Sequence, residues 1–95
     1  MSERQQATEA SVPHTPRGVR LQLDKRRDQW VLQAPERLFV LDPIALEVVK
    51  RCDGEATLGA IVDDLAATFE APRDVILKDV TALLQDLADK QVMTL

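Results

Sequence analysis

Few side chains of this chain could carry out covalent chemistry. Its 95 residues include one cysteine, Cys52, one histidine, His14, and no tyrosine. A cysteine thiol next to a histidine imidazole can act as a nucleophile with its general base. His14, however, lies in a proline-flanked stretch that is not expected to fix its position. One Cys and one His cannot form a zinc cluster within one chain. The three scattered glycines, Gly18, Gly54 and Gly59, predict no phosphate-binding loop. We therefore predict no catalytic residue, no metal site, no cofactor and no enzymatic activity.

Cys52 is predicted to be a buried core thiol, because it shares a helical face with Ala45 and Val48. A single cysteine excludes an internal disulfide and fits a reducing compartment. No apolar run approaches the roughly 20 residues that span a bilayer, and residues 1–16 lack the apolar core of a secretory signal. These features predict a cytoplasmic protein with no membrane contact.

The first elements that would position a site are strands. Apolar and polar residues alternate over 19–23 and again over 29–34, with a charged turn between them. Residues 38–41 are apolar on both faces. The three segments predict an antiparallel sheet. Trp30 is expected in its core, with an exposed anchor for a partner as the alternative.

Three helices follow. Asp42 suits the N-cap of the first helix and Pro43 suits its first position, and Gly54 suits its end. Thr57 suits the N-cap of the second helix. Ala71-Pro72 starts the third. The second helix has an apolar stripe formed by Leu58, Ile61, Val62, Leu65 and Phe69. The predicted fold class is α+β, a three-stranded antiparallel sheet followed by three helices, winged helix-turn-helix-like, with a flexible N-terminal arm at 1–16 and one domain at 17–95.

Surplus apolar surface marks a candidate binding site. Ile76, Val80, Leu83 and Leu87 would pack the third helix on the core, which leaves Leu77 and Leu84 to line a groove. The third strand should also expose one apolar face and a free edge. Such an edge accepts an extended peptide as a fourth strand, or it is covered by the tail or a second copy of the chain. The residue pattern leaves these alternatives, including a homodimer, open.

Charge is unevenly distributed along the chain. Residues 1–51 carry a net charge of +2 and residues 52–95 a net charge of −6. Lys25, Arg26 and Arg27 form either a solvated turn or a contact for an acidic partner. The third helix has no basic residue between Asp79 and Asp89, which disfavours nucleic acid as a partner. A winged-helix DNA-binding regulator is kept only as an alternative.

The sequence resembles the PqqD family of pyrroloquinoline quinone biosynthesis, and the wider class of peptide-recognition domains in modified-peptide pathways. The resemblance covers about residues 17–92 and leaves the first 16 residues outside. Asp42 stands where the family often has Asn, which is an equally suitable cap. The matching residues are Trp30-Val31-Leu32-Gln33-Ala34-Pro35-Glu36-Arg37, Leu41-Asp42, Ala45, Cys52-Asp53-Gly54, Ile61-Val62 and Leu65.

The resemblance implies a non-catalytic peptide chaperone. Family members bind the precursor peptide PqqA and present it to PqqE, a radical S-adenosylmethionine enzyme that joins a Glu and a Tyr side chain within it. The leader segment is expected to add to the third strand and lie against the third helix. The implied peptide-binding residues are Arg37, Leu38, Phe39, Val40, Leu41, Leu77, Val80 and Leu84. The turn Lys25–Arg27 is a candidate contact for the partner enzyme.

Overall fold

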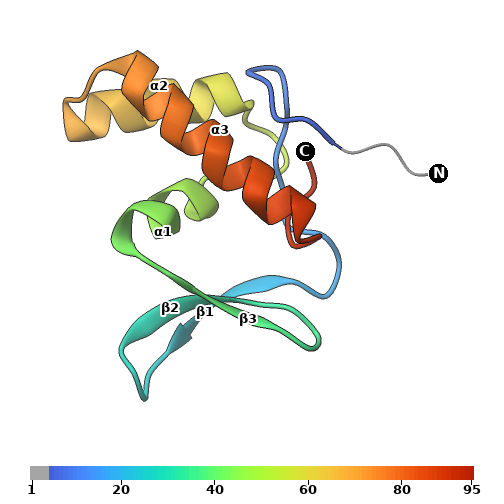
Figure 1. The fold of residues 1–95 in the computed structure, drawn as a ribbon. Helices are drawn as coiled ribbons and strands as arrows, with labels where there is room; N and C mark the ends of the chain where they lie inside the picture. Colours follow the sequence, from blue (N-terminus) through green and yellow to red (C-terminus); the bar gives the residue numbers. More distant parts are fainter. Residues whose placement is uncertain (1–4) are drawn as a thin grey trace.

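The computed structural model describes residues 5–95 as a small sheet followed by three helices (Figure 1). The three strands pair in chain order, and both neighbouring pairs are antiparallel. This arrangement confirms the predicted fold class. The elements are β1 (Arg20–Asp24), β2 (Gln29–Gln33), β3 (Leu38–Leu41), α1 (Pro43–Lys50), α2 (Leu58–Phe69) and α3 (Arg73–Asp89).

The two faces of the sheet differ. Leu32 on β2 lies opposite Leu21 on β1 and Phe39 on β3, and these side chains face the core. Since side chains alternate along a strand, Leu38 and Val40 point to the other face. All three helices lie on one side of the sheet in Figure 1, with α1 between the sheet and the α2–α3 pair. Only one face of the sheet is therefore covered by helices.

Local capping determines where the first two helices begin. The Asp42 Oδ1 accepts the N–H of Ala45 at 2.7 Å, and the Thr57 Oγ1 accepts the N–H of Ala60 at 3.1 Å. Each side chain satisfies a backbone donor that the helix leaves unpaired, which confirms both predicted caps. Gly54 has a φ of +81°, a left-handed conformation that glycine adopts without the steric cost of a Cβ. The helix ends earlier, at Lys50 with Arg51 as its C-cap, so the prediction that Gly54 ends it is wrong.

One core joins the sheet to the helices. It contains Cys52, as predicted, and fully buried side chains from each layer, but it excludes Trp30 and Phe69. Both aromatic rings are substantially exposed. The prediction that Trp30 packs in the core is therefore wrong, and Phe69 is the exposed member of the predicted stripe of α2. The buried members are Leu32, Ala34, Leu41, Ala45, Val48, Val49, Cys52, Leu58, Ile61, Val62, Leu65, Val80, Leu84, Leu87, Val92 and Met93.

The N-terminal segment, predicted as a flexible arm at 1–16, lies against the helices over its described residues. The Ser11 and Glu9 carbonyls accept the N–H groups of Leu58 and Gly59, in the first turn of α2. His14 forms isolated bridges with Asp53 and with Thr94, which joins the two ends of the chain. These backbone contacts, which residue composition does not reveal, hold residues 5–16 in place. Residues 1–4 of the predicted arm lie outside the described residues.

Candidate peptide-binding site

The free edge of β3 presents unpaired backbone groups. Ala34 and Arg37 exchange two hydrogen bonds, which closes the β2–β3 hairpin. Backbone groups alternate in direction along an antiparallel strand, so Phe39 pairs with β2 while Leu38 and Val40 turn their N–H and C=O groups outward. No further strand lies beyond β3 within the described sheet. The outward groups of these two residues are therefore available to another chain.

The side chains around this edge combine apolar and cationic surface. Leu38 is 50% exposed and Val40 is 52% exposed, whereas Leu41 is buried. The Phe39 ring has the guanidinium of Arg37 at 5.6 Å and the ammonium of Lys90 at 5.7 Å from its centroid. The Arg37 Nη2 also donates to the Lys90 carbonyl at 2.7 Å, at the end of α3. Strand β3 is thus attached to the C-terminal end of α3.

The predicted site residues of α3 do not share one environment. Leu77 is half-buried, but Val80 is 3% exposed and Leu84 is completely buried. The prediction that Leu84 is surplus to the core is wrong, because the helix is rotated so that Val80, Leu84 and Leu87 face inward. Ile76 and Leu83, predicted as core, are only half-buried.

An apolar cavity lies beside this rotated face of α3. It has a volume of about 420 Å³ and is bounded by α1, the end of α2 and α3. Sequence reasoning missed two of its side chains, Ile44 and Phe69, which are 65% and 48% exposed. The signal for Ile44 was an apolar side chain directly after Pro43, one helical turn before the buried Val48. Phe69 gave no such signal, because it continues the apolar stripe of α2.

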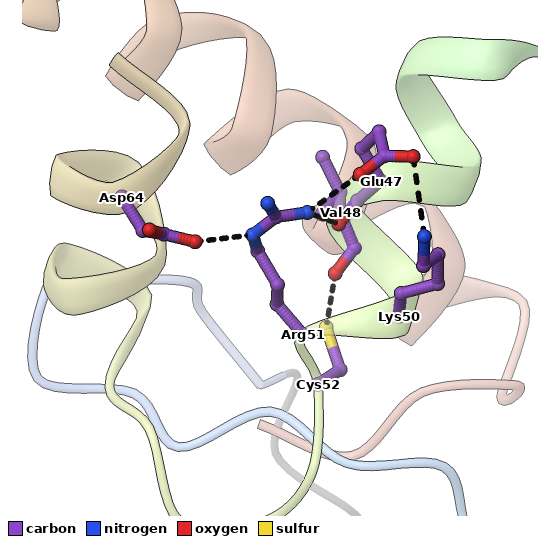
Figure 2. A network of polar contacts seen from close by, with 6 residues as sticks. All are labelled: Glu47, Val48, Lys50, Arg51, Cys52 and Asp64. Atoms are coloured by element: carbon purple, nitrogen blue, oxygen red, sulfur yellow. Dashed lines mark hydrogen bonds and ion pairs between the residues drawn. The ribbon is translucent and has the colours of Figure 1, made fainter. Parts of the chain in front are cut away.

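Cys52 lies buried just after α1, with its thiol directed at the Val48 carbonyl (Figure 2). Its Sγ donates to the Val48 carbonyl at 3.3 Å, and burial raises the pKa of the thiol to about 12. Beside it, the Arg51 side chain joins α1 to α2 by binding Glu47 and Asp64. The hydrogen bond from Arg51 lowers the pKa of Glu47. These groups are paired with each other and stabilise the packing of the two helices.

The basic turn lies apart from the free edge of β3. Lys25, Arg26 and Arg27 are all exposed, and the Asp24 Oδ1 accepts the N–H groups of Arg26 and Arg27. The turn joins β1 to β2, whereas the hairpin that begins β3 lies at the opposite end of the sheet. The turn therefore lies at the end of the sheet where β3 ends, and β2 separates it from the free edge.

No group of three or more His, Cys, Asp or Glu side chains among residues 5–95 is placed to hold a metal ion. None of the helices described is long and apolar enough to cross a membrane.

Comparison of the sequence with known families gives a match to the family of coenzyme PQQ synthesis protein D (PqqD), over residues 29–93. A protein of Bradyrhizobium diazoefficiens named PqqA binding protein is 51% identical over 87 residues, which cover 92% of this chain and 84% of that protein. A Gluconobacter oxydans protein of the same name is 46% identical over 85 residues, covering 90% of this chain and 88% of its own length.

Two solved structures resemble the fold. The solution structure of the PqqD truncation of Methylobacterium extorquens PqqCD has a TM-score of 0.81 and 40% identity, covering 94% of this chain and 95% of that one. It is described as a functional, stand-alone recognition element for ribosomally synthesized and post-translationally modified peptides. The crystal structure of PqqD from Xanthomonas campestris has a TM-score of 0.61 and 46% identity, covering 93% and 98% of the two chains.

Proposed function

The chain belongs to the PqqD family, and from that premise we propose that it is a non-catalytic carrier of the precursor peptide PqqA. The peptide adds to the free edge of β3 as a fourth antiparallel or parallel strand. Backbone hydrogen bonds then supply affinity, and neighbouring side-chain pockets supply selectivity. The observation that carries this proposal is the outward-facing backbone of Leu38 and Val40, flanked by their half-exposed side chains.

The other edge of the sheet is less suited to strand addition. Strand β1 carries Arg20, Gln22 and Asp24 on one face, and charged side chains on an edge strand oppose pairing with another chain. Strand β3 has no charged residue between Leu38 and Leu41. It also lies beside the end of α3 through the Arg37–Lys90 contact, so a peptide at this edge meets a helix as well as a strand.

Presentation of the peptide to the radical S-adenosylmethionine enzyme PqqE is the second half of the proposal. Capture orders a flexible peptide before it meets its enzyme and raises its effective concentration there. Lys25, Arg26 and Arg27 form the contact for that enzyme, because the turn is exposed and joins β1 to β2, so that it is not part of the β3 edge. We place the carrier in the cytoplasm, where the single thiol of Cys52 stays reduced.

Amide hydrogen exchange tests strand addition directly. In the free protein the Phe39 and Leu41 amides, which face β2, should exchange slowly, and the Leu38 and Val40 amides should exchange fast. Saturating synthetic PqqA should slow the exchange of Leu38 and Val40 and leave Phe39 and Leu41 nearly unchanged. The amides of the turn 24–28 serve as an internal control. Protection of that turn alone, with fast exchange at Val40, would show that the peptide binds elsewhere.

Self-pairing of the β3 edge is the competing explanation for its exposure. Sedimentation velocity over a range of protein concentrations separates the two, because a homodimer that uses this edge must dissociate before the peptide binds. Under the proposal, diluting the protein leaves the dissociation constant for PqqA unchanged. An apparent affinity that rises on dilution would assign the edge to a second copy of the chain.

A further inference from the structure

An exposed indole side chain lies at the end of the sheet where β3 ends. Trp30, the one tryptophan of the chain, is 38% exposed. It pairs with Leu23 on β1 and with Leu41, the last residue of β3. Leu41 belongs to the core, whereas Leu23 and Trp30 lie outside the core cluster. These two cross-strand neighbours therefore form an apolar pair beside the core and not in it.

Three cations lie in the turn that connects the two members of this pair. Lys25, Arg26 and Arg27 are exposed, and none of them forms an ion pair with another of residues 5–95. The Asp24 Oδ1 accepts two backbone N–H groups of the turn and so fixes its shape. Figure 1 shows the turn projecting away from the helices. Since the whole chain has a net charge of −4, this turn is a basic site on an acidic protein.

We propose that Leu23, Trp30 and the turn Lys25–Arg27 form one docking surface, the indole surface, with Trp30 as its anchor. Its partner is an acidic protein surface with an apolar pocket for the indole, carried by the enzyme that receives the peptide. Tryptophan and arginine are among the residues most enriched in the energetic centres of protein interfaces, and opposite charges steer two such surfaces together. The inference rests on the proposed presentation of the peptide and adds both the anchor residue and the chemistry of the partner.

The position of the indole surface suits the transfer of a bound peptide. A peptide on the free edge of β3 lies two strand spacings, about 10 Å, from β2, where Trp30 is located. The segment of that peptide that continues past Leu41 leaves the sheet at the end that carries the indole surface. An enzyme docked there meets this segment without displacing the strand pairing at Leu38 and Val40.

The single tryptophan provides a direct readout. Protein labelled with 5-fluorotryptophan gives one ¹⁹F signal, from Trp30. Adding PqqE to the PqqA-loaded protein should change the chemical shift of this signal; the shift is the readout, because a large partner broadens every signal. A change of equal size with PqqA alone would place the indole in the peptide-binding site and overturn the proposal.

The other outcomes separate the indole surface from the proposed function. If PqqE binds, as sedimentation shows, while the ¹⁹F shift stays unchanged, presentation stands and the indole surface is refuted. If PqqE binds neither the free nor the loaded protein, presentation itself fails. A shift that appears when the protein alone is concentrated would assign the surface to a second copy of the chain and overturn the proposal.

Matched variants test the apolar anchor. Trp30→Ala should weaken PqqE binding by about thirtyfold, the size expected of a binding hot spot, and leave the affinity for PqqA unchanged. Val75→Ala is its control, because Val75 is an apolar side chain that is 50% exposed on α3. Biolayer interferometry measures both dissociation constants, and circular dichroism shows whether each variant is folded. Equal effects of the two substitutions would refute the anchor.

A second set of variants tests the charges and does not touch the core, so it decides the proposal even if Trp30→Ala does not fold. Combining Lys25→Gln, Arg26→Gln and Arg27→Gln should weaken PqqE binding by about tenfold at low salt and less at high salt, because salt screens the attraction. The control replaces with Gln three exposed basic residues outside the turn that have no ion pair among residues 5–95: Arg17, Arg20 and Lys78. Equal losses from the two triple variants would show a general effect of net charge and overturn a docking surface at this turn.

Discussion

Replacing Val40 with proline removes one outward N–H from the β3 edge without touching the pairs that hold the sheet together. Val40 does not donate to β2, because the hydrogen bonds of the hairpin fall on Arg37, Phe39 and Leu41. Proline is tolerated on an edge strand where its missing donor faces solvent. The free protein should therefore keep its fold.

The expected loss of affinity follows from one backbone hydrogen bond. Such a bond contributes about 0.5–1.5 kcal/mol net, and 1.4 kcal/mol corresponds to a factor of about ten in a dissociation constant. Val40→Pro should thus weaken PqqA binding by about three- to tenfold. Val40→Ala removes the half-exposed side chain but keeps the N–H, so the ratio between the two variants isolates the backbone contribution.

Isothermal titration calorimetry with synthetic PqqA measures both dissociation constants, and circular dichroism confirms that each variant is folded. A Val40→Pro protein that is folded and binds like Val40→Ala would refute the role of the outward N–H. Strand addition at this edge would then have to be abandoned in favour of side-chain contacts alone.

Three further predictions concern the stability of the domain. Leu84→Ala should lower the free energy of unfolding by about 2–5 kcal/mol and Leu77→Ala by about 1 kcal/mol, because only Leu84 is fully buried. Urea denaturation measures both free energies. Equal losses would contradict the difference in burial between the two side chains. Deleting residues 1–12 should speed hydrogen exchange of the Leu58 amide, which loses its acceptor, the Ser11 carbonyl; unchanged exchange would show that water or another group replaces it. The folded state raises the Cys52 thiol pKa from 9.0 to about 12, so the neutral thiol stabilises the fold below pH 9 and this contribution is lost as pH rises toward 12. Cys52 should accordingly resist alkylation at pH 8 until urea is added, and rapid labelling of the native protein would disprove its burial.

Local signals in the sequence predicted the elements of the fold well. Asp42 and Thr57 act on backbone groups only three residues away, so their roles depend on sequence neighbours alone. The alternation of apolar and polar residues over 19–23 and 29–34 likewise predicts strands from their two-residue period alone. The strands, the helices and their order were therefore accessible without tertiary information, as was the doubly apolar character of β3.

Tertiary contacts explain what the sequence did not reveal. The period of α3 allows either Leu83 or Leu84 to face the core, and the choice depends on how the helix rotates against α2. Phe69 continues a regular apolar stripe, but α2 ends there and leaves the ring at the surface. The contacts of Glu9 and Ser11 with α2 join residues about 50 positions apart. No local pattern encodes such pairings.

His14, near the start of the chain, forms a β-bridge with Thr94, near its end, so the two ends of the described chain lie side by side. Farther out, the Gln5 Oε1 accepts the Leu95 N–H at 2.9 Å, so the described start and the end of the chain are direct neighbours (Figure 1). A short linker could join these ends, and new termini could open in the exposed turn at 25–28, which joins β1 to β2. A domain joined after Leu95 would therefore leave the molecule beside Gln5, where the described N-terminal segment begins.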